Sequence, residues 1–315
     1  MNEINGAILS PLAGYTDMAF RELASSLNAF MTVTEMVSAK ALYFEDKKTK
    51  SLMEISPKEK NVAIQIFGNE PDIMGEVVKK YLNNSPYSMI DINMGCPAPK
   101  IVKNGQGSAL IKNRDLAYEV MKNVVRNSTK PVSIKIRKSI DGIDSMEIVR
   151  LANKAGVSMI TVHGRSREEY YSGLSDWNYI KEVVINSKVP VIGNGDIKNY
   201  EDFLEKKNYS KVSGISIGRG AIGNPFIFDE IYKKSMGFDY RYPTNIDRIN
   251  MAIKHLDLIV KYKGQRLGVL EMRKQFVGYF KSMKGSKDLR DKINKISDDE
   301  EIKRLLKEYR ELVNS

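Results

Sequence analysis

The chain has 315 residues, of which 42% are hydrophobic, and it contains one cysteine, so a disordered chain and a disulfide framework are excluded and the reducing cytoplasm is the expected compartment. Its longest stretch without Asp, Glu, Lys or Arg, residues 4–16, is well short of the roughly 20 apolar residues that span a bilayer. The formal net charge of +11, from 50 Lys and Arg against 39 Asp and Glu, points to a polyanionic partner.

Short β-branched and apolar segments recur through the first 240 residues, at the length of buried strands. Amphipathic helical patterns separate most of them, for example at 72–82, 114–125 and 145–155. Eight strands alternating with helices fit a (β/α)₈ TIM barrel, which typically needs about 250 residues. A doubly wound parallel sheet gives the same alternation, so periodicity alone leaves both folds open. The eight expected strands are 7–9, 31–34, 62–66, 88–92, 132–136, 159–162, 189–192 and 214–217.

Segments rich in glycine, polar residues and charge follow most of these strands. The C-terminal ends of barrel strands carry the active site in enzymes of this fold. We therefore expect these segments to meet around one site. They are residues 10–17, 65–68, 93–97, 135–137, 163–167, 194–197 and 219–222.

The pattern changes after residue 242, where strands give way to helices. We expect helices at 246–261, 268–282, 289–296 and 298–313, the last opening with a capping-box spacing of Ser297 and Glu300. The predicted division is a barrel domain, 1–242, followed by a small all-α helical domain, 243–315. Residues 243–295 hold 13 basic and 5 acidic side chains, a net charge of 13 − 5 = +8. This charge is typical of an RNA-docking face, although a solvated basic surface has the same composition.

Cys96 follows the fourth strand, between Gly95 and Pro97. A lone cysteine is often a small buried hydrophobic residue, but a position at a strand end favours chemistry. With an ordinary pKa of about 8.5, the thiol is protonated at neutral pH and can act as a general acid. It would act as a thiolate nucleophile if a base lay nearby. The sequence alone leaves both roles open.

Charged and polar side chains end the next strands. Lys135 and Arg137 share one face of strand five, where an inward cation indicates an anionic ligand or an ion pair with a carboxylate. His163, after strand six, can donate a hydrogen bond to a cofactor or phosphate, whereas His255 is expected to be structural or an RNA contact. One Cys and two His make a zinc site of the usual kind improbable, and no metal is expected.

The segments 194–197 and 218–221 follow strands seven and eight. In barrels these two loops frequently bind a phosphate, because glycine lets backbone N–H groups approach the oxygens. The pair predicts a phosphorylated cofactor such as FMN.

Together these segments resemble the tRNA-dihydrouridine synthases, in particular their bacterial B-type branch. The resemblance covers nearly the whole chain in family order, and the ordered set is far more specific than any single segment. The matching segments are SPLAGYTD (10–17), TEMVSA (34–39), QIFG (65–68), DINMGCP (91–97), GQGSAL (105–110), KIR (135–137), HGRSR (163–167) with Tyr171, Gly173 and Trp177, NGDI (194–197), GRGA (218–221) and MRK (272–274).

The resemblance implies an FMN-binding barrel and a helical tRNA-binding domain, with NADPH as the reductant and D-loop uridines of tRNA as the target. Reduced FMN would deliver hydride from N5 to C6 of uracil, and Cys96 would protonate C5. Asn93 and Arg165 would bind the substrate. The resemblance assigns cofactor binding to Pro11, Leu12, Ala13, Gln65, Lys135, His163, Asn194, Gly195, Asp196, Gly218 and Arg219. We expect a cytoplasmic monomer with no membrane partner.

Two positions depart from the family pattern. Gln106 replaces a small residue, and Gln275 stands where related proteins often have His. Both departures bear on which tRNA is bound. Two other functions fit parts of the sequence: an FMN-dependent dehydrogenase of a free pyrimidine, of the dihydroorotate type, and a non-catalytic RNA-binding protein that keeps the barrel as a scaffold. The basic helical extension argues against the first, and the retained Cys96, Lys135 and His163 argue against the second.

Overall fold

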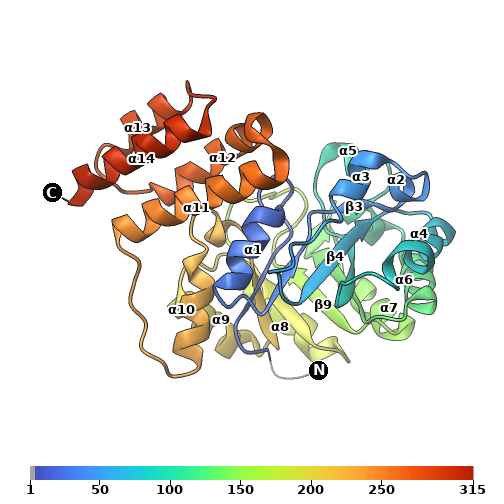
Figure 1. Cartoon of the computed structure of the whole chain (residues 1–315). Helices are drawn as coiled ribbons and strands as arrows, with labels where there is room; N and C mark the ends of the chain where they lie inside the picture. Colours follow the sequence, from blue (N-terminus) through green and yellow to red (C-terminus); the bar gives the residue numbers. More distant parts are fainter. Residues whose placement is uncertain (1–3, 315) are drawn as a thin grey trace.

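A computed structural model describes residues 4–314. Eight parallel strands form a closed barrel, in which β1 pairs with both β2 and β11, and β2 pairs with β4 to complete the ring. This architecture confirms the predicted (β/α)₈ barrel and excludes the doubly wound sheet (Figure 1). The barrel strands are β1 (Ala7–Leu9), β2 (Met31–Val33), β4 (Val62–Phe67), β5 (Met89–Met94), β6 (Val132–Arg137), β9 (Met159–His163), β10 (Val191–Asn194) and β11 (Gly214–Ile217).

Helices cover the outside of the barrel and bury its Val, Ile and Leu side chains. They are α1 (Met18–Ser26), α4 (Pro71–Val77), which continues as a π-helical turn (Val78–Leu82), α6 (Arg114–Asn127), α7 (Met146–Ala155), α8 (Trp177–Asn186), α9 (Tyr200–Ser210) and α10 (Phe226–Ser235). Shorter elements decorate the C-terminal ends of the strands: β3 (Val37–Ser38), α2 (Ala39–Tyr43), α3 (Lys47–Ser51), α5 (Pro99–Lys103), the hairpin β7 (Ser139–Ile140) with β8 (Ile143–Asp144), and 3₁₀ turns at Gly107–Lys112 and Arg219–Ala221.

All eight predicted strands are present, and several run further than predicted. Parallel pairing continues through Asn93 and Lys135, which are register partners on β5 and β6, and through Arg137, His163 and Asn194. These polar residues therefore lie at the ends of rigid strands and not in loops. Ladder hydrogen bonds fix their backbone positions, and their side chains are aimed by the pleat of the strand.

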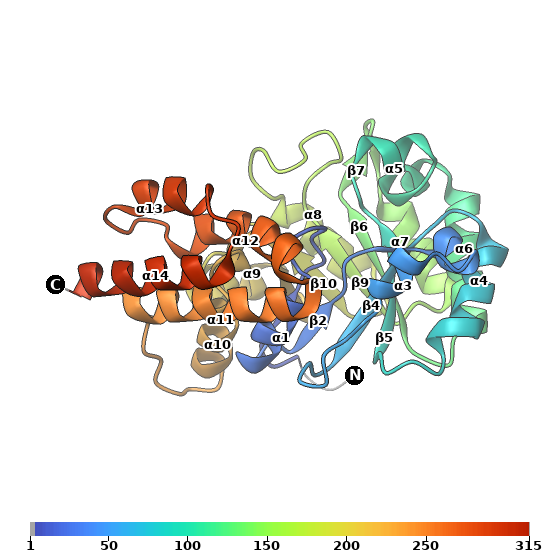
Figure 2. The ribbon, with the colours of Figure 1, turned by 45° about the horizontal axis from the view of Figure 1, so that its top comes forward.

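Four helices follow the barrel: α11 (Asn245–Lys263), α12 (Gln265–Tyr279), α13 (Ser286–Ile293) and α14 (Asp299–Asn314). They share one apolar core, which also takes in Ala19 of α1, and they stand beside the barrel in Figure 2. The predicted capping box at Ser297 and Glu300 is wrong, because α14 begins later and Asp298 accepts the Glu300 N–H at 3.2 Å. A reciprocal capping box instead opens α11, between Thr244 and Asp247.

Buried polar contacts join these helices to the barrel. Asp17, which caps α1, forms an ion pair with Lys263 at 2.7 Å, and the Gln275 amide donates to the Tyr15 carbonyl at 2.9 Å. His255 is fully buried against Phe20, so the option that it contacts RNA is wrong and the structural role is confirmed. These contacts hold α11 and α12 against the segment that follows β1. Within residues 4–314, no helix combines the length and hydrophobicity that a membrane crossing requires.

Candidate active site

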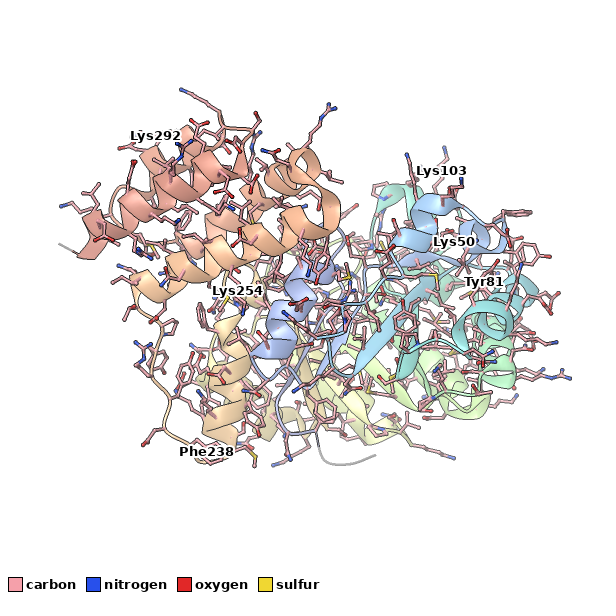
Figure 3. All side chains as sticks on the ribbon, in the orientation of Figure 1. Lys50, Tyr81, Lys103, Phe238, Lys254 and Lys292 are labelled. Atoms are coloured by element: carbon pink, nitrogen blue, oxygen red, sulfur yellow. The ribbon has the colours of Figure 1, made fainter. Side chains whose placement is uncertain are left out.

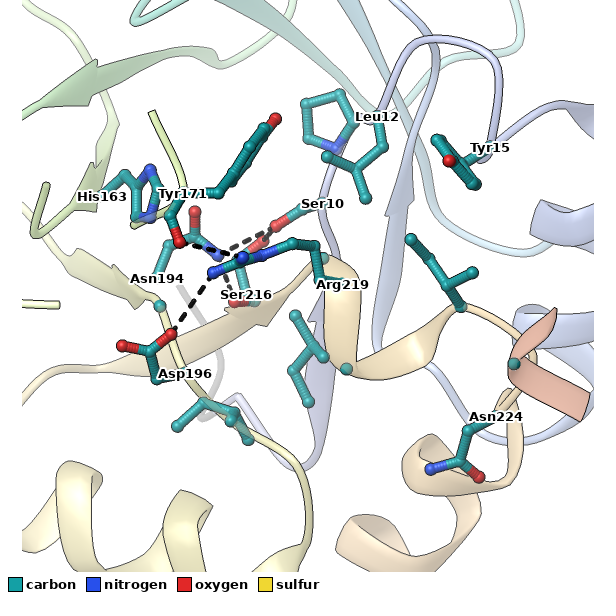
Figure 4. A pocket seen from close by; sticks show the side chains of 18 of the residues that line it. Ser10, Leu12, Tyr15, His163, Tyr171, Asn194, Asp196, Ser216, Arg219 and Asn224 are labelled. Carbon is teal, nitrogen blue, oxygen red and sulfur yellow. Dashed lines mark hydrogen bonds and ion pairs between the residues drawn. The ribbon is translucent and has the colours of Figure 1, made fainter. Parts of the chain in front are cut away.

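A cavity of about 1720 Å³ opens at the C-terminal ends of the barrel strands and extends to the helical region. All fourteen residues predicted for the site line it, although they come from segments up to 208 positions apart, Pro11 to Arg219. Figure 4 shows part of this lining, with His163, Asn194, Asp196 and Arg219 around one side of the cavity. The barrel therefore brings the predicted side chains together in space, as expected from strand ends that share one face.

The floor of the cavity, at Gln65 and Asn93, rests on a chain of hydrogen bonds that begins at Asp91, which does not itself line the cavity. Its carboxylate accepts from the Gln65 amide at 2.7 Å and from the Ser133 hydroxyl at 2.6 Å. The Gln65 Oε1 atom in turn accepts from the Asn93 Nδ2 atom at 2.7 Å. The Gln65 amide thus presents its NH₂ to Asp91 and its oxygen to Asn93, so one chain of hydrogen bonds orients both amides.

The Asn93 side chain continues this chain to Cys96. Asn93 Oδ1 accepts from the backbone N–H of Cys96 at 2.9 Å and from that of Gly95 at 3.2 Å. The Cys96 carbonyl accepts from the Ser108 hydroxyl at 3.0 Å. Gly107 packs against this loop with a φ of 61°, where a side chain would press on Cys96. The thiol-bearing loop is thus fastened from both sides.

Burial raises the pKa of the Cys96 thiol above its ordinary value, although the charges of Arg137 and Lys135 oppose this shift. The thiol is therefore protonated at neutral pH and can act as a proton donor. A thiolate nucleophile would need a lowered pKa. Of the two roles that the sequence left open, these electrostatics favour the general acid.

Lys135 projects into the cavity from β6, and burial is the main reason that its pKa falls to about 8. Its Nζ atom lies 3.2 Å from Asn194 Oδ1. Arg137 donates to the backbone carbonyls of Gly95, Ser166 and Tyr170. Among residues 4–314, neither Lys135 nor Arg137 forms an ion pair with a carboxylate. The ion pair that was one explanation for these inward cations is therefore absent from this part of the chain.

The pKa of His163 lies far below its ordinary range, first because the imidazole is buried and then because four cations surround it. The ring is therefore neutral. Arg165 Nη1 lies 3.3 Å from His163 Nε2, and arginine can only donate, so Nε2 is the acceptor and the proton resides on Nδ1. His163 can thus act as a donor through Nδ1.

Arg165 lines the cavity although only 1% of it is exposed. Its Nη2 atom lies 2.7 and 2.8 Å from the two Asp196 carboxylate oxygens, and its N–H groups also reach the carbonyls of Ser172 and Gly173. Asp196 also holds Arg219, at 3.4 Å. This Asp196 carboxylate therefore positions two guanidinium groups on one side of the cavity.

The two glycine-rich segments at the ends of β10 and β11 are packed against each other. A side chain at Gly220 would collide with the carbonyl oxygen of Ile197, and one at Gly195 would collide with Ser175. Gly195 also has a φ of 136°, which residues with a Cβ rarely adopt. The close approach brings Arg219 to the side of the cavity formed by the 194–197 segment.

The lining is strongly basic. It holds nine Lys and Arg residues, and among the described lining residues Asp196 is the single carboxylate. Such a cavity favours an anionic ligand. Within residues 4–314, no group of three or more His, Cys, Asp and Glu side chains is placed to hold a metal ion.

Sequence reasoning missed the outer part of the cavity. The loop after β9 contributes Tyr170 and Leu174 there, and the helical region contributes four cations. The excess of Lys and Arg in 243–295 was the available signal for those cations, which are Arg248, Lys274, Lys281 and Arg290. Of the two departures, Gln106 donates to Asn69 at 3.3 Å, and Gln275 is buried where α12 meets Tyr15.

Arg165→Met should lower the free energy of unfolding by about 3 kcal/mol, because it removes the bidentate partner of Asp196 and leaves the carbonyls of Ser172 and Gly173 without the Arg165 N–H groups. Arg219→Met provides the matched control, since Arg219 is 45% exposed on its side chain and its loss should cost less than about 1 kcal/mol. Urea denaturation of both variants measures the difference. Equal costs for the two variants would contradict this account of Arg165.

The chain is similar to known proteins over nearly its whole length. A family model described as "Dihydrouridine synthase (Dus)" matches residues 8–314. The chain is 34% identical over 307 residues to a probable tRNA-dihydrouridine synthase of Rickettsia conorii, covering 96% of this chain and 92% of the relative. It is 36% identical over 301 residues to a probable tRNA-dihydrouridine synthase 1 of Synechocystis, covering 94% and 84%. It is 32% identical over 305 residues to tRNA-dihydrouridine synthase B of Pasteurella multocida, covering 94% and 90%.

Among solved structures, the histamine dehydrogenase of Rhizobium sp. 4-9 is similar, with a TM-score of 0.56 and 12% identity. The match covers 81% of this chain and 49% of the other. At this identity the similarity concerns the fold, and it agrees with the barrel seen here.

Proposed function

The chain belongs to the dihydrouridine synthase family, and from this we infer that it is a flavin-dependent tRNA-dihydrouridine synthase that reduces uridines in tRNA to 5,6-dihydrouridine. The observation that carries the proposal is the convergence of the fourteen predicted residues, with the Cys96 thiol among them, in one basic cavity. The test compares turnover of tRNA with turnover of free uridine. Turnover of tRNA alone supports the proposal, and equal turnover of free uridine would favour the free-pyrimidine dehydrogenase.

The residues of the cavity fit FMN. The volume of about 1720 Å³ exceeds what one mononucleotide and one base fill, and nine cations can meet a phosphate and a polyanionic substrate. In this proposal Pro11, Leu12 and Ala13 line the flavin, and Gln65, Lys135 and His163 contact its ring. The phosphate and ribityl chain lie on residues 194–196 with Gly218 and Arg219. Arg165 serves as a positioning residue, because its guanidinium is already occupied by Asp196 and two carbonyls.

Bound FMN, reduced by NADPH, would supply the hydride for uracil C6. The protein's own contribution begins with Cys96, whose raised pKa keeps the proton that C5 must receive. Asn93 holds the Cys96 backbone N–H at 2.9 Å and would also bind the uracil edge. Lys135 would stabilise negative charge on the N1/O2 edge of the flavin.

Lys135→Met should weaken FMN binding by about tenfold, since it replaces a half-buried cation with a neutral side chain of nearly the same shape. The pKa of Lys135 is about 8, so its charge is present below pH 8 and lost above it. FMN affinity of the wild-type protein should therefore fall as the pH rises through 8. Fluorescence titration of the FMN-free protein on both sides of pH 8 measures both effects. A pH response of the same size in Lys135→Met would show that another group causes it.

The partner proposed for the helical region, 243–315, is the tRNA backbone. Its basic side chains continue the cationic lining of the cavity, and Figure 3 shows Lys292 at its outer surface. The D-loop is the proposed target region, because unpaired RNA loops release a base at lower cost than helices do. We further propose a cytoplasmic monomer with barrel domain 1–242. A non-catalytic RNA-binding role is not favoured, since it leaves Cys96, Lys135 and His163, which all line the cavity, without a purpose.

A further inference from the structure

The loop between β9 and α8 carries exposed apolar side chains at the edge of the cavity. Tyr170 is 38% exposed, Tyr171 43% and Leu174 83%, and all three line the cavity. In the view of Figure 2 this loop stands above the barrel, near the hairpin β7–β8. Neighbouring exposed apolar groups at the entrance to a site indicate a surface that contacts a partner.

Three arginines hold this loop by its backbone. Arg137 donates to two of its carbonyls, at 2.8 Å each, Arg165 to two more, at 2.8 and 2.7 Å, and Arg219 to one, at 3.1 Å. The guanidinium groups of Arg137 and Arg219 also lie over the Tyr171 ring, at 5.6 and 4.7 Å from its centre. Figure 4 shows the contact between Tyr171 and Arg219. The carbonyls are those of Ser166, Tyr170, Tyr171, Ser172 and Gly173.

The backbone of the loop is strained where it presents its first aromatic ring. Tyr170 has a φ of 49°, in the left-handed region that bulky residues avoid. Arg137 holds the Tyr170 carbonyl in this conformation. Strain of this kind persists where the surrounding structure fixes it, and it gathers at functional sites. The loop is therefore a rigid support that exposes Tyr170 and Leu174.

The charge around Tyr170 and Leu174 favours a partner that is anionic and also has flat apolar faces. Nine cations line the cavity, against the single carboxylate of Asp196 among its described residues. RNA combines a negative backbone with nucleobases that stack on aromatic and apolar side chains. A base that leaves its stack to reach the cavity also leaves its neighbour without a stacking partner.

We propose that Tyr170 and Leu174 form a stacking platform for the nucleobase adjacent to the target uridine. Once the uridine has entered the cavity, these two side chains replace it as the stacking partner of that nucleobase. The inference rests on the proposed function. It assigns to the loop a part in substrate binding, and it leaves hydride and proton transfer to the residues of the cavity floor.

The test measures KM and kcat for a tRNA transcript, together with the rate at which NADPH reduces the bound flavin. Leu174→Ala should raise KM about fivefold, and combining it with Tyr170→Asn, which tolerates the left-handed backbone, should raise KM about thirtyfold. Leu174→Phe should keep KM at or below the wild-type value, because a larger flat side chain stacks as well. Flavin reduction should be unchanged in every variant.

Ile185→Ala is the matched control, since Ile185 is 74% exposed on α8 and does not line the cavity. Its KM should equal that of the wild-type protein. The inference is overturned if Leu174→Ala leaves KM within about twofold of wild type, or if Leu174→Phe raises KM as much as Leu174→Ala does. If the wild-type protein reduces no uridine in tRNA, the proposed function itself fails, which is a separate outcome.

Discussion

Cys96→Ala should reduce the rate of dihydrouridine formation by about 10²–10⁴-fold, the usual contribution of a general acid. The substitution removes the only thiol in the chain and no side chain from the flavin cradle. FMN content and tRNA affinity should therefore stay at wild-type values. Nucleoside mass spectrometry of the product tRNA, flavin absorbance and a tRNA binding titration measure the three quantities.

The pH dependence of the rate of dihydrouridine formation tests the role of Cys96 independently. Burial raises the pKa of the Cys96 thiol, so the thiol is protonated at neutral pH. It loses its proton only as the pH rises through that elevated pKa. The rate should be flat around pH 7 and fall in alkaline solution. Because loss of the Lys135 charge above pH 8 also weakens FMN binding, the profile is measured at saturating FMN. Cys96→Ser should then lose the part of the alkaline fall that the thiol causes, because a serine hydroxyl does not ionise there. Wild-type turnover by Cys96→Ala would eliminate Cys96 as the acid.

The affinity for tRNA should fall by about 10³–10⁵-fold between about 50 and 200 mM salt, if six to ten phosphates are neutralised. Replacing Lys281, Lys284 and Lys287 with alanine should weaken binding at low salt. The slope of the logarithm of the binding constant against the logarithm of the salt concentration should become shallower by about 0.7–0.9 for each phosphate that the protein no longer neutralises. All three side chains are exposed, and Lys281 lines the cavity. Fluorescence anisotropy of labelled tRNA across a salt series measures the slope.

The matched control replaces three exposed lysines on the barrel side of the molecule, Lys154, Lys181 and Lys188, which do not line the cavity. It removes the same charge, so the net charge of the protein changes equally. If both triple variants show the same fall in affinity and in slope, the helical region is not the anchor and its charge is a solvated basic surface.

The parallel strands were predictable from sequence because they are continuous apolar runs, such as the buried Ile64, Ile90, Ile134 and Ile160 on four neighbouring strands, whereas the resemblance to a known family decided between a barrel and a doubly wound sheet. A parallel sheet covered by helices requires this pattern. The site was predictable for a related reason, since polar residues that interrupt such runs at one end must share one face of the barrel. The resemblance to a known family supplied the roles that geometry alone does not give.

Other features depend on pairings between distant segments, for which the sequence holds no local signal. Asp91 lies in the middle of a strand pattern, and its partnership with Gln65 and Ser133 exists only after the barrel closes. Asp17 and Lys263, which join the barrel to the helices, are 246 positions apart, from 263 − 17. The burial of Arg165 and its ion pair with Asp196 became visible only in three dimensions.

The central claim is that this cavity, with FMN bound and Cys96 as the acid, reduces uridine within tRNA. The most direct measurement incubates the purified FMN-bound protein with NADPH and an unmodified tRNA transcript and maps the product by mass spectrometry. The account predicts D-loop uridines that are two hydrogen atoms heavier, formed by the wild-type protein and nearly absent with Cys96→Ala. A transcript of unchanged mass, from protein that holds FMN and oxidises NADPH, would contradict it.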